Sequence, residues 1–196
     1  LKITGVLNDV DFLFIYRMMP NLKNLDIAEV NITALPIQAF YKSTNVENLI
    51  LPNTLITIGE EMFYQSKLKT VVIPANATTI GNSAFEQCAS LISIDIPANV
   101  ETIGTAVFWG CSSLATVTFE NGSQSSGAFS DCTALTSIEI PASVETIEAA
   151  AFKGCSSLAT VTFENGSQLK TIGGGSSYYG AFSDCTALTS IEIPAS

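Results

Sequence analysis

Five cysteines carry the most reactive side chains of this chain, and they recur at one position of a repeating pattern. Each of them lies three residues after a phenylalanine: Cys88, Cys111, Cys132, Cys155 and Cys185. Such thiols could form disulfides, bind a metal or act as nucleophiles. Equivalent side chains in stacked repeats lie parallel and about 4.8 Å apart, which does not suit a disulfide. The chain also has no Cys-x-x-Cys pair and no histidine to activate a thiolate, so we expect a ladder of buried free thiols.

Carboxylates are the next candidates for chemistry. Four of them share the fifth position of a recurring six-residue pattern: Asp26, Asp95, Glu139 and Glu192. Two carboxyl groups about 5 Å apart could perform acid–base work. Nothing in the pattern implies a pocket, however, so a solvated face is the favoured interpretation. Calcium binding through Glu120-Asn121 or Glu164-Asn165 lacks a loop of clustered ligands. The sequence therefore predicts no enzyme, no metal and no cofactor.

One glycine-rich insertion carries two tyrosines. Gly173-Gly174-Gly175 lacks the Gly-Lys-Ser/Thr of a phosphate loop, so it is interpreted as a flexible loop tip. Tyr178 and Tyr179 follow it and are the residue type that interfaces use as anchors. Two alternatives remain open: the tyrosines anchor a partner, or the loop packs on its own repeat.

These residues are positioned by a repeat that runs through most of the chain. A pattern of the form apolar-x-x-apolar-x-apolar starts at residues 22, 46, 68, 91, 114, 135, 158 and 188, and a proline often ends it. Proline donates no ladder hydrogen bond, so it marks a strand end. Pattern positions one, four and six should point inward, and positions three and five outward. Stacking such units buries a continuous core under one parallel sheet, with right-handed connections.

The second half of each unit reads Ile-Gly-x-x-Ala-Phe-x-x-Cys, as in Ile80–Cys88. It is too short for a long helix, so we expect one helical or 3₁₀ turn on the return. The phenylalanines should form a core spine: Phe40, Phe63, Phe85, Phe108, Phe129, Phe152 and Phe182. These two halves together resemble the leucine-rich repeat superfamily, so the prediction is an α/β right-handed leucine-rich-repeat solenoid with one parallel sheet on its concave face.

Near-ideal copies at Ile80–Cys88 and Leu91–Pro97 resemble the BspA-like class of bacterial leucine-rich repeats. This resemblance covers about residues 22–196. It implies a surface location and binding of matrix or host proteins. No Asn is expected at a fixed position after the strand, unlike in the better-known leucine-rich repeats.

The two ends depart from the repeat. Residues 1–21 are predicted to form a cap, with a short strand at Leu1–Thr4 and a largely buried helix from Asn8 or Asp9 to about Met19. Residues 22–196 then hold repeats of about 23 residues. The chain stops just after a strand, so either further repeats follow or another molecule covers this end, and we favour further repeats. The unit after residue 120 lacks its Ile-Gly corner, which leaves open that residues are missing near 124–125.

Charge and composition bound the function. The net charge is −10, and residues 71–196 carry only two lysines, so nucleic acid and anionic membranes are poor partners. No apolar run is long enough for a transmembrane helix. We expect a non-catalytic binding or adhesion module for extracellular protein or glycan, at the cell surface or secreted; the alternative is a structural spacer. The candidate binding surface comprises Asp26, Ser93, Asp95, Thr116, Thr118, Ser137, Glu139, Thr160 and Glu192, with Tyr178 and Tyr179.

Overall fold

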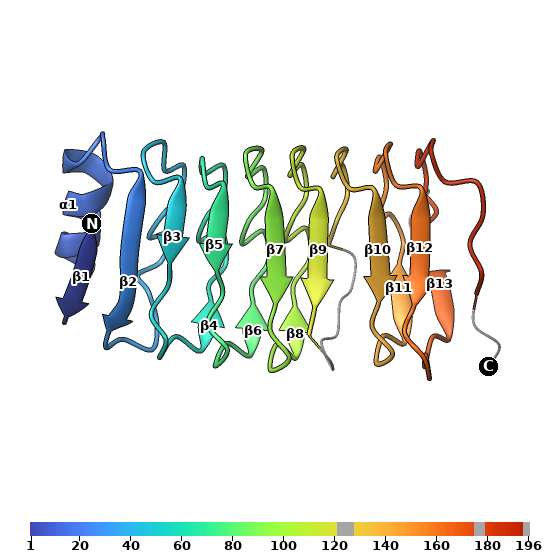
Figure 1. The fold of residues 1–196 in the computed structure, drawn as a ribbon, viewed down its shortest axis with the longest axis horizontal. Coiled ribbons are helices and arrows are strands. Elements are labelled where there is room, and N and C mark those ends of the chain that lie inside the picture. The colour runs from blue at the N-terminus through green and yellow to red at the C-terminus, as the bar shows by residue number, and fades with distance from the viewer. Residues whose placement is uncertain (121–127, 175–178, 194–196) are drawn as a thin grey trace.

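The chain forms a parallel β-solenoid of about seven turns with almost no helix. The computed structural model describes residues 1–120, 128–174 and 179–193. In Figure 1 the turns follow one another along the long axis in chain order. Each described turn has a strand on one side and a return, and in five turns the corner between them holds a second strand.

The strands on the main side are all parallel. They are β1 (Lys2–Gly5), β2 (Asn24–Val30), β3 (Asn48–Ile50), β5 (Thr70–Val72), β7 (Ser93–Ile96), β9 (Thr116–Phe119), β10 (Ser137–Ile140) and β12 (Thr160–Phe163). They form three successive ladders, β1-β2-β3-β5, β7-β9 and β10-β12, and not the single sheet that the sequence predicted. Most of these strands have only three or four residues. Because so short a strand makes few ladder bonds, a small splay between turns is enough to end the pairing.

The corners contain a second set of short parallel strands, which the sequence did not predict. They are β4 (Thr57–Ile58), β6 (Thr79–Ile80), β8 (Thr102–Ile103), β11 (Thr146–Glu148) and β13 (Thr171–Gly174). They pair as β4-β6-β8 and β11-β13. The Ile-Gly corner of the repeat is therefore a strand end, and stacked isoleucines such as Ile58 and Ile80 are in register.

The predicted helical turn on each return is wrong. Ser83 and Gln87 flank Phe85 at φ angles of 53° and 57°, in the left-handed region, so the segment makes two consecutive tight turns. The amide of Phe85 donates to Val107 O in the next turn (2.9 Å), and that of Gln87 donates to Trp109 O (2.6 Å). Because these amides bond to a neighbouring turn, they are not available for the i→i−4 bonds of a helix.

The core consists of inward strand positions and a stack of phenylalanines. Leu91, Ile94 and Ile96 are buried, which confirms the alternation predicted for the strand. Consecutive phenylalanine rings from Phe40 to Phe182 stack with centroids 4.9–5.5 Å apart and interplanar angles of 22° or less. The predicted spine is therefore confirmed, and it is one continuous aromatic column.

The N-terminal segment contains the single helix of the described residues, α1 (Asp9–Met18). Asn8 caps it, because its side chain accepts from the amides of Val10 (2.8 Å) and Asp11 (3.2 Å). These bounds agree with the predicted helix. Its burial does not, since among the helix side chains that the structure describes Val10, Phe14 and Met18 are exposed, while Phe12 and Ile15 are buried in the core.

A largely buried helical cap is therefore not seen. Phe12 of the helix packs edge-on against Phe40 of the first turn, with ring centroids 6.2 Å apart, and β1 pairs with β2 as a further strand of the sheet. Asn45 links α1 to the first turn of the solenoid, because its buried Nδ2 donates to Met19 O (3.0 Å) and Ile15 O (3.3 Å) at the end of the helix.

Asparagines after the strands also link the turns. Asn76 and Asn99 each lie two residues after a strand-ending proline, at Pro74 and Pro97. Asn76 Nδ2 donates to Asn53 O (2.9 Å) and Asn99 Nδ2 donates to Ala75 O (2.8 Å), in the preceding turn in each case. In these two turns the amide satisfies a loop carbonyl that the sheet leaves unpaired, but the position is not filled by Asn throughout the repeat.

Candidate binding surface

The outward side chains of the main strands form two rows, which together we name the outer face. The first outer row holds the third pattern position: Asn24, Asn48, Thr70, Ser93, Thr116, Ser137 and Thr160. The second outer row holds the fifth: Asp26, Ile50, Val72, Asp95, Thr118, Glu139 and Thr162. Within each ladder, neighbours in a row are register partners. The solenoid thus presents one side chain per turn along each row.

Eight of the candidate surface residues predicted from the sequence lie on these rows, namely Asp26, Ser93, Asp95, Thr116, Thr118, Ser137, Glu139 and Thr160. Asp26 is half-buried and the other seven are exposed. Glu192 follows after β12 and is also exposed, beside a surface hollow of about 620 Å³. The repeat therefore places these residues on one surface.

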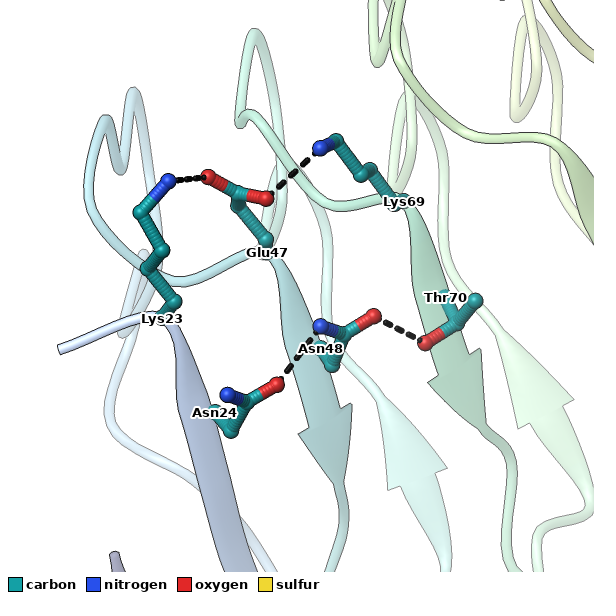
Figure 2. Close-up of polar contacts among 6 residues, drawn as sticks. All are labelled: Lys23, Asn24, Glu47, Asn48, Lys69 and Thr70. Atoms are coloured by element: carbon teal, nitrogen blue, oxygen red, sulfur yellow. Dashed lines mark hydrogen bonds and ion pairs between the residues drawn. The ribbon is translucent and has the colours of Figure 1, made fainter.

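In the N-terminal turns, hydrogen bonds join outward side chains of neighbouring strands (Figure 2). Asn48 Nδ2 donates to Asn24 Oδ1 (2.7 Å), and Thr70 Oγ1 donates to Asn48 Oδ1 (2.8 Å). The sequence reasoning did not single out this chain of hydrogen bonds. It runs across β2, β3 and β5 and restrains three side chains of the first outer row, Asn24, Asn48 and Thr70.

A network of ion pairs lies beside these hydrogen bonds, at the start of the same strands (Figure 2). Glu47 accepts from Lys23 (2.5 Å) through one carboxylate oxygen and pairs with Lys69 (2.7 Å) through the other. These hydrogen bonds hold the pKa of Glu47 at about 2, well below its usual range. The Glu47 carboxylate therefore links its own turn to the preceding one through Lys23 and to the following one through Lys69.

An exposed aliphatic pair interrupts the second outer row. Ile50 and Val72 are register partners on β3 and β5, with 40% and 58% of their surface exposed. Asp26 precedes them in the row and Asp95 follows. A hollow of about 490 Å³ lies over this region and is lined by Asn24, Asp26, Asn48, Ile50, Thr70 and Val72, among others. The sequence analysis did not predict this pair as part of the binding surface, although an aliphatic residue at an outward pattern position was the signal for it.

The carboxylates of the outer face and its margin accept hydrogen bonds from nearby groups. Asp26 Oδ1 accepts from the amide of Ala28 (3.1 Å), and Asp95 Oδ1 accepts from Thr118 Oγ1. Glu164, a candidate calcium ligand, accepts from the Ala142 amide (2.8 Å). Within residues 1–120, 128–174 and 179–193, no three acidic or cysteine side chains gather in a way that could hold a metal ion.

The cysteines lie inside the solenoid as buried free thiols. Each thiol donates to the carbonyl of the phenylalanine one turn earlier, as Cys111 Sγ does to Phe85 O (3.1 Å). Burial raises the pKa of Cys88 to about 11 and that of Cys155 to about 12. The predicted ladder of buried thiols is confirmed, and thiolate chemistry is disfavoured at these positions.

The tyrosine insertion is described only in part, because Tyr178 lies outside the described residues. Tyr179 is 45% exposed, and Lys153 Nζ lies 3.5 Å from its ring centroid. Such a distance is typical of a cation–π contact. Tyr179 therefore packs against its own solenoid through Lys153.

Other aromatic residues at the surface lie on the returns. Tyr41 and Tyr64 stack with centroids 5.1 Å apart, and Lys42 lies over both rings. Trp109 is 39% exposed and donates from Nε1 to Asp131 (2.8 Å). The sequence reasoning missed these contacts, whose signal was an aromatic residue directly after the core phenylalanine.

The repeat and the fold agree with the family comparison. The model of the BspA type leucine rich repeat region matches in six copies, over residues 13–126 and 122–196. The chain belongs to this family of leucine-rich-repeat proteins. A search of the curated proteins found no match.

Solved structures share the fold. A leucine-rich repeat protein from Bacteroides ovatus is 28% identical with a TM-score of 0.60, and the match covers 74% of this chain and 38% of that one. One from Eubacterium ventriosum is 23% identical with a TM-score of 0.63, covering 92% and 51%. The pneumococcal vaccine antigen PcpA is 20% identical with a TM-score of 0.62, covering 85% and 46%. This chain thus spans about half or less of the length of each. In its described residues, no helix is long and apolar enough to cross a bilayer.

Proposed function

We propose that this chain is a non-catalytic binding module that presents its outer face to an extracellular protein or glycan, at the bacterial cell surface or after secretion. The observation that carries the proposal is the pair of outer rows, which place one outward side chain per turn at a regular spacing. An extended partner running along the solenoid meets the same two rows in every turn.

Two further observations support an external binding role. The chain belongs to a family of bacterial leucine-rich repeats, and the similar PcpA is described as a vaccine antigen. An antigen of that use must be reachable from outside the cell, so we extend a surface location to this chain. The net charge of −10 favours basic or neutral partners over nucleic acid.

The non-catalytic part of the proposal rests on the state of the reactive groups. Burial raises the pKa values of the cysteine thiols, which opposes their use as nucleophiles. Glu47 titrates at about 2, far from the range of a general base at neutral pH.

A structural spacer is the second candidate. It is favoured by the outer face of β9, β10 and β12, where the outward positions carry hydroxyl groups and one carboxylate: Thr116, Thr118, Ser137, Glu139, Thr160 and Thr162. Such a surface resembles an ordinary solvated one. A spacer needs only this solubility and the stiffness of the stacked core.

An array of extracellular matrix proteins and glycans separates the two candidates. The wild-type chain is compared with Asp95→Lys plus Glu139→Lys, which reverses two charges on the outer face. We expect at least one ligand to be retained by the wild type and weakened in the variant. A ligand that binds both equally places the site elsewhere, and no ligand across the array favours the spacer.

A further inference from the structure

We propose that the N-terminal part of the outer face, from β2 to β7, binds an extended peptide segment. The segment has a basic, an aliphatic and a second basic side chain at positions i, i+2 and i+4. The inference rests on the proposed function, since it names the partner chemistry for the same face. Its basis is the order of side chains in the second outer row, which reads Asp26, Ile50, Val72, Asp95 in four successive turns.

The spacing of the turns matches that of an extended chain. Adjacent strands lie about 4.8 Å apart, so three steps from Asp26 to Asp95 span about 14 Å. An extended peptide advances about 3.4 Å per residue, and four residues therefore span about the same length. With its end side chains at the two carboxylates, the middle side chain of the peptide lies over Ile50 and Val72. The long stems of Lys or Arg take up the difference where β5 and β7 do not form a ladder.

The aliphatic pair supplies the apolar contact. Ile50 and Val72, with Leu1 beside them, are the exposed hydrophobic residues of the hollow of about 490 Å³, and the amides of Asn24 and Asn48 and the hydroxyl of Thr70 border it. Burying an aliphatic side chain against this pair removes apolar surface from water. The hydrogen bonds that join Asn24, Asn48 and Thr70 hold this border rigid before a ligand arrives, which lowers the entropic cost of binding.

The two flanking carboxylates are suited to cationic groups. Asp26 Oδ1 accepts from the Ala28 amide, and Asp95 Oδ1 accepts from Thr118 Oγ1. Neither of these two hydrogen bonds uses the second carboxylate oxygen, Oδ2. Lys2 is the register partner of Asp26, but its ammonium pairs with Glu29 at 2.8 Å. In the later turns the second outer row has no aliphatic residue, so the acid–aliphatic–acid order belongs to the N-terminal part alone among the described strands.

A synthetic peptide, acetyl-Ser-Lys-Ser-Leu-Ser-Lys-Ser-amide, tests this directly. Methyl NMR spectra of the chain are recorded during a titration with the peptide to about millimolar concentration. We expect the signals of Ile50 and Val72 to shift first and most. The control peptide, acetyl-Ser-Ser-Lys-Leu-Lys-Ser-Ser-amide, has the same composition with the lysines beside the leucine, and we expect it to bind at least threefold more weakly.

Two matched double variants separate the site from general charge attraction. Asp26→Asn plus Asp95→Asn removes the flanking charges but keeps the Oδ1 acceptors, and we expect binding to weaken about three- to tenfold, as for two exposed ion pairs. Glu139→Gln plus Glu192→Gln removes two negative charges from the same surface, away from the aliphatic pair. We expect it to weaken binding less than twofold.

Three results overturn the inference: no shift at Ile50 and Val72, equal binding of the control peptide, or equal weakening by both double variants. Failure of the peptide together with an outer-face ligand from the array overturns this inference and leaves the proposed function standing. Failure of the peptide together with an array ligand that is insensitive to outer-face variants, or with no ligand at all, overturns both.

Discussion

The outer face differs between the N-terminal turns, with β2, β3 and β5, and the later turns, with β7, β9, β10 and β12. In the N-terminal turns it carries ion pairs, an amide chain and two exposed aliphatic residues. In the later turns it carries mainly hydroxyl groups and acids. Beneath both, the same phenylalanine stack continues without a break. The phenylalanine column is common to both regions, whereas the outward side chains differ, and buried Ser43 and Ser66 stand where the later turns have a cysteine.

This contrast separates what the repeat determines from what it leaves free. The inward positions determine where each outward side chain stands, because they set the turn spacing and the register. They do not determine its identity, since a strand on the surface tolerates Asn, Thr or Ile at the same position. Binding specificity on such a solenoid therefore depends on substitutions that do not change the fold.

The largest expected effect comes from the shared core. Phe85→Ala removes a fully buried ring from between Phe63 and Phe108, and we expect a loss of about 3–5 kcal/mol in the free energy of unfolding. Thr116→Ala, on the outer face, should change it by less than about 0.5 kcal/mol. Chemical denaturation measures both. Equal losses would show that inward and outward positions are not distinct.

A smaller effect is expected at the corners. A Cβ on Gly104 would lie 2.6 Å from Asn82 N in the preceding turn, whereas one on Gly59 would meet only Met62 Cε at 3.4 Å. Gly104→Ala should therefore cost about 1–3 kcal/mol, because the backbone of one turn must shift. Gly59→Ala, at the equivalent position of an earlier turn, should cost much less. Thermal unfolding of the two variants tests the packing distance between turns, and similar midpoints would contradict it.

The network of ion pairs in the N-terminal region predicts a titration. The pKa of Glu47 is about 2 in the folded chain and about 4.3 when unfolded, so its contribution to stability is present above pH 4.3 and is lost as the pH falls towards 2. Lys23→Met plus Lys69→Met should return this pKa towards 4.3. Lys170→Met, which removes the pair with Glu145, should leave it unchanged. Carbon-13 NMR of the carboxylate measures it, and a wild-type midpoint near 4 would contradict the shared ion pair.

The strands and the core could be predicted from the sequence because apolar residues recur at fixed positions. The returns could not, since Ile80–Cys88 contains no feature that separates a helical turn from two tight turns. Hydrogen bonds to the next turn, such as that from Gln87 to Trp109, decide between them. Such bonds exist only after the turns have stacked.

The candidate surface was predicted in part for a related reason. Serine, threonine and acidic residues at outward positions are easy to recognise against an apolar core. Ile50 and Val72 stand within the runs Leu49–Leu51 and Val71–Ile73, where inward and outward aliphatic residues look alike. Only the phase of the repeat assigns them to the outward fifth position, where the folded chain exposes them, and the cross-turn bonds of Asn48 likewise depend on the register.

One matched pair on a single strand tests the central claim that the exposed aliphatic residues do not serve the fold. Val71 points inward and is 7% exposed, and Val72 points outward and is 58% exposed. Valine to threonine keeps the shape and replaces one methyl group with a hydroxyl, which is costly only where the side chain is buried. We predict that Val71→Thr lowers the free energy of unfolding by about 1–3 kcal/mol and that Val72→Thr changes it by less than about 0.5 kcal/mol. Equal losses from the two substitutions would contradict the account, because Val72 would then be a residue of the core and not of a binding surface.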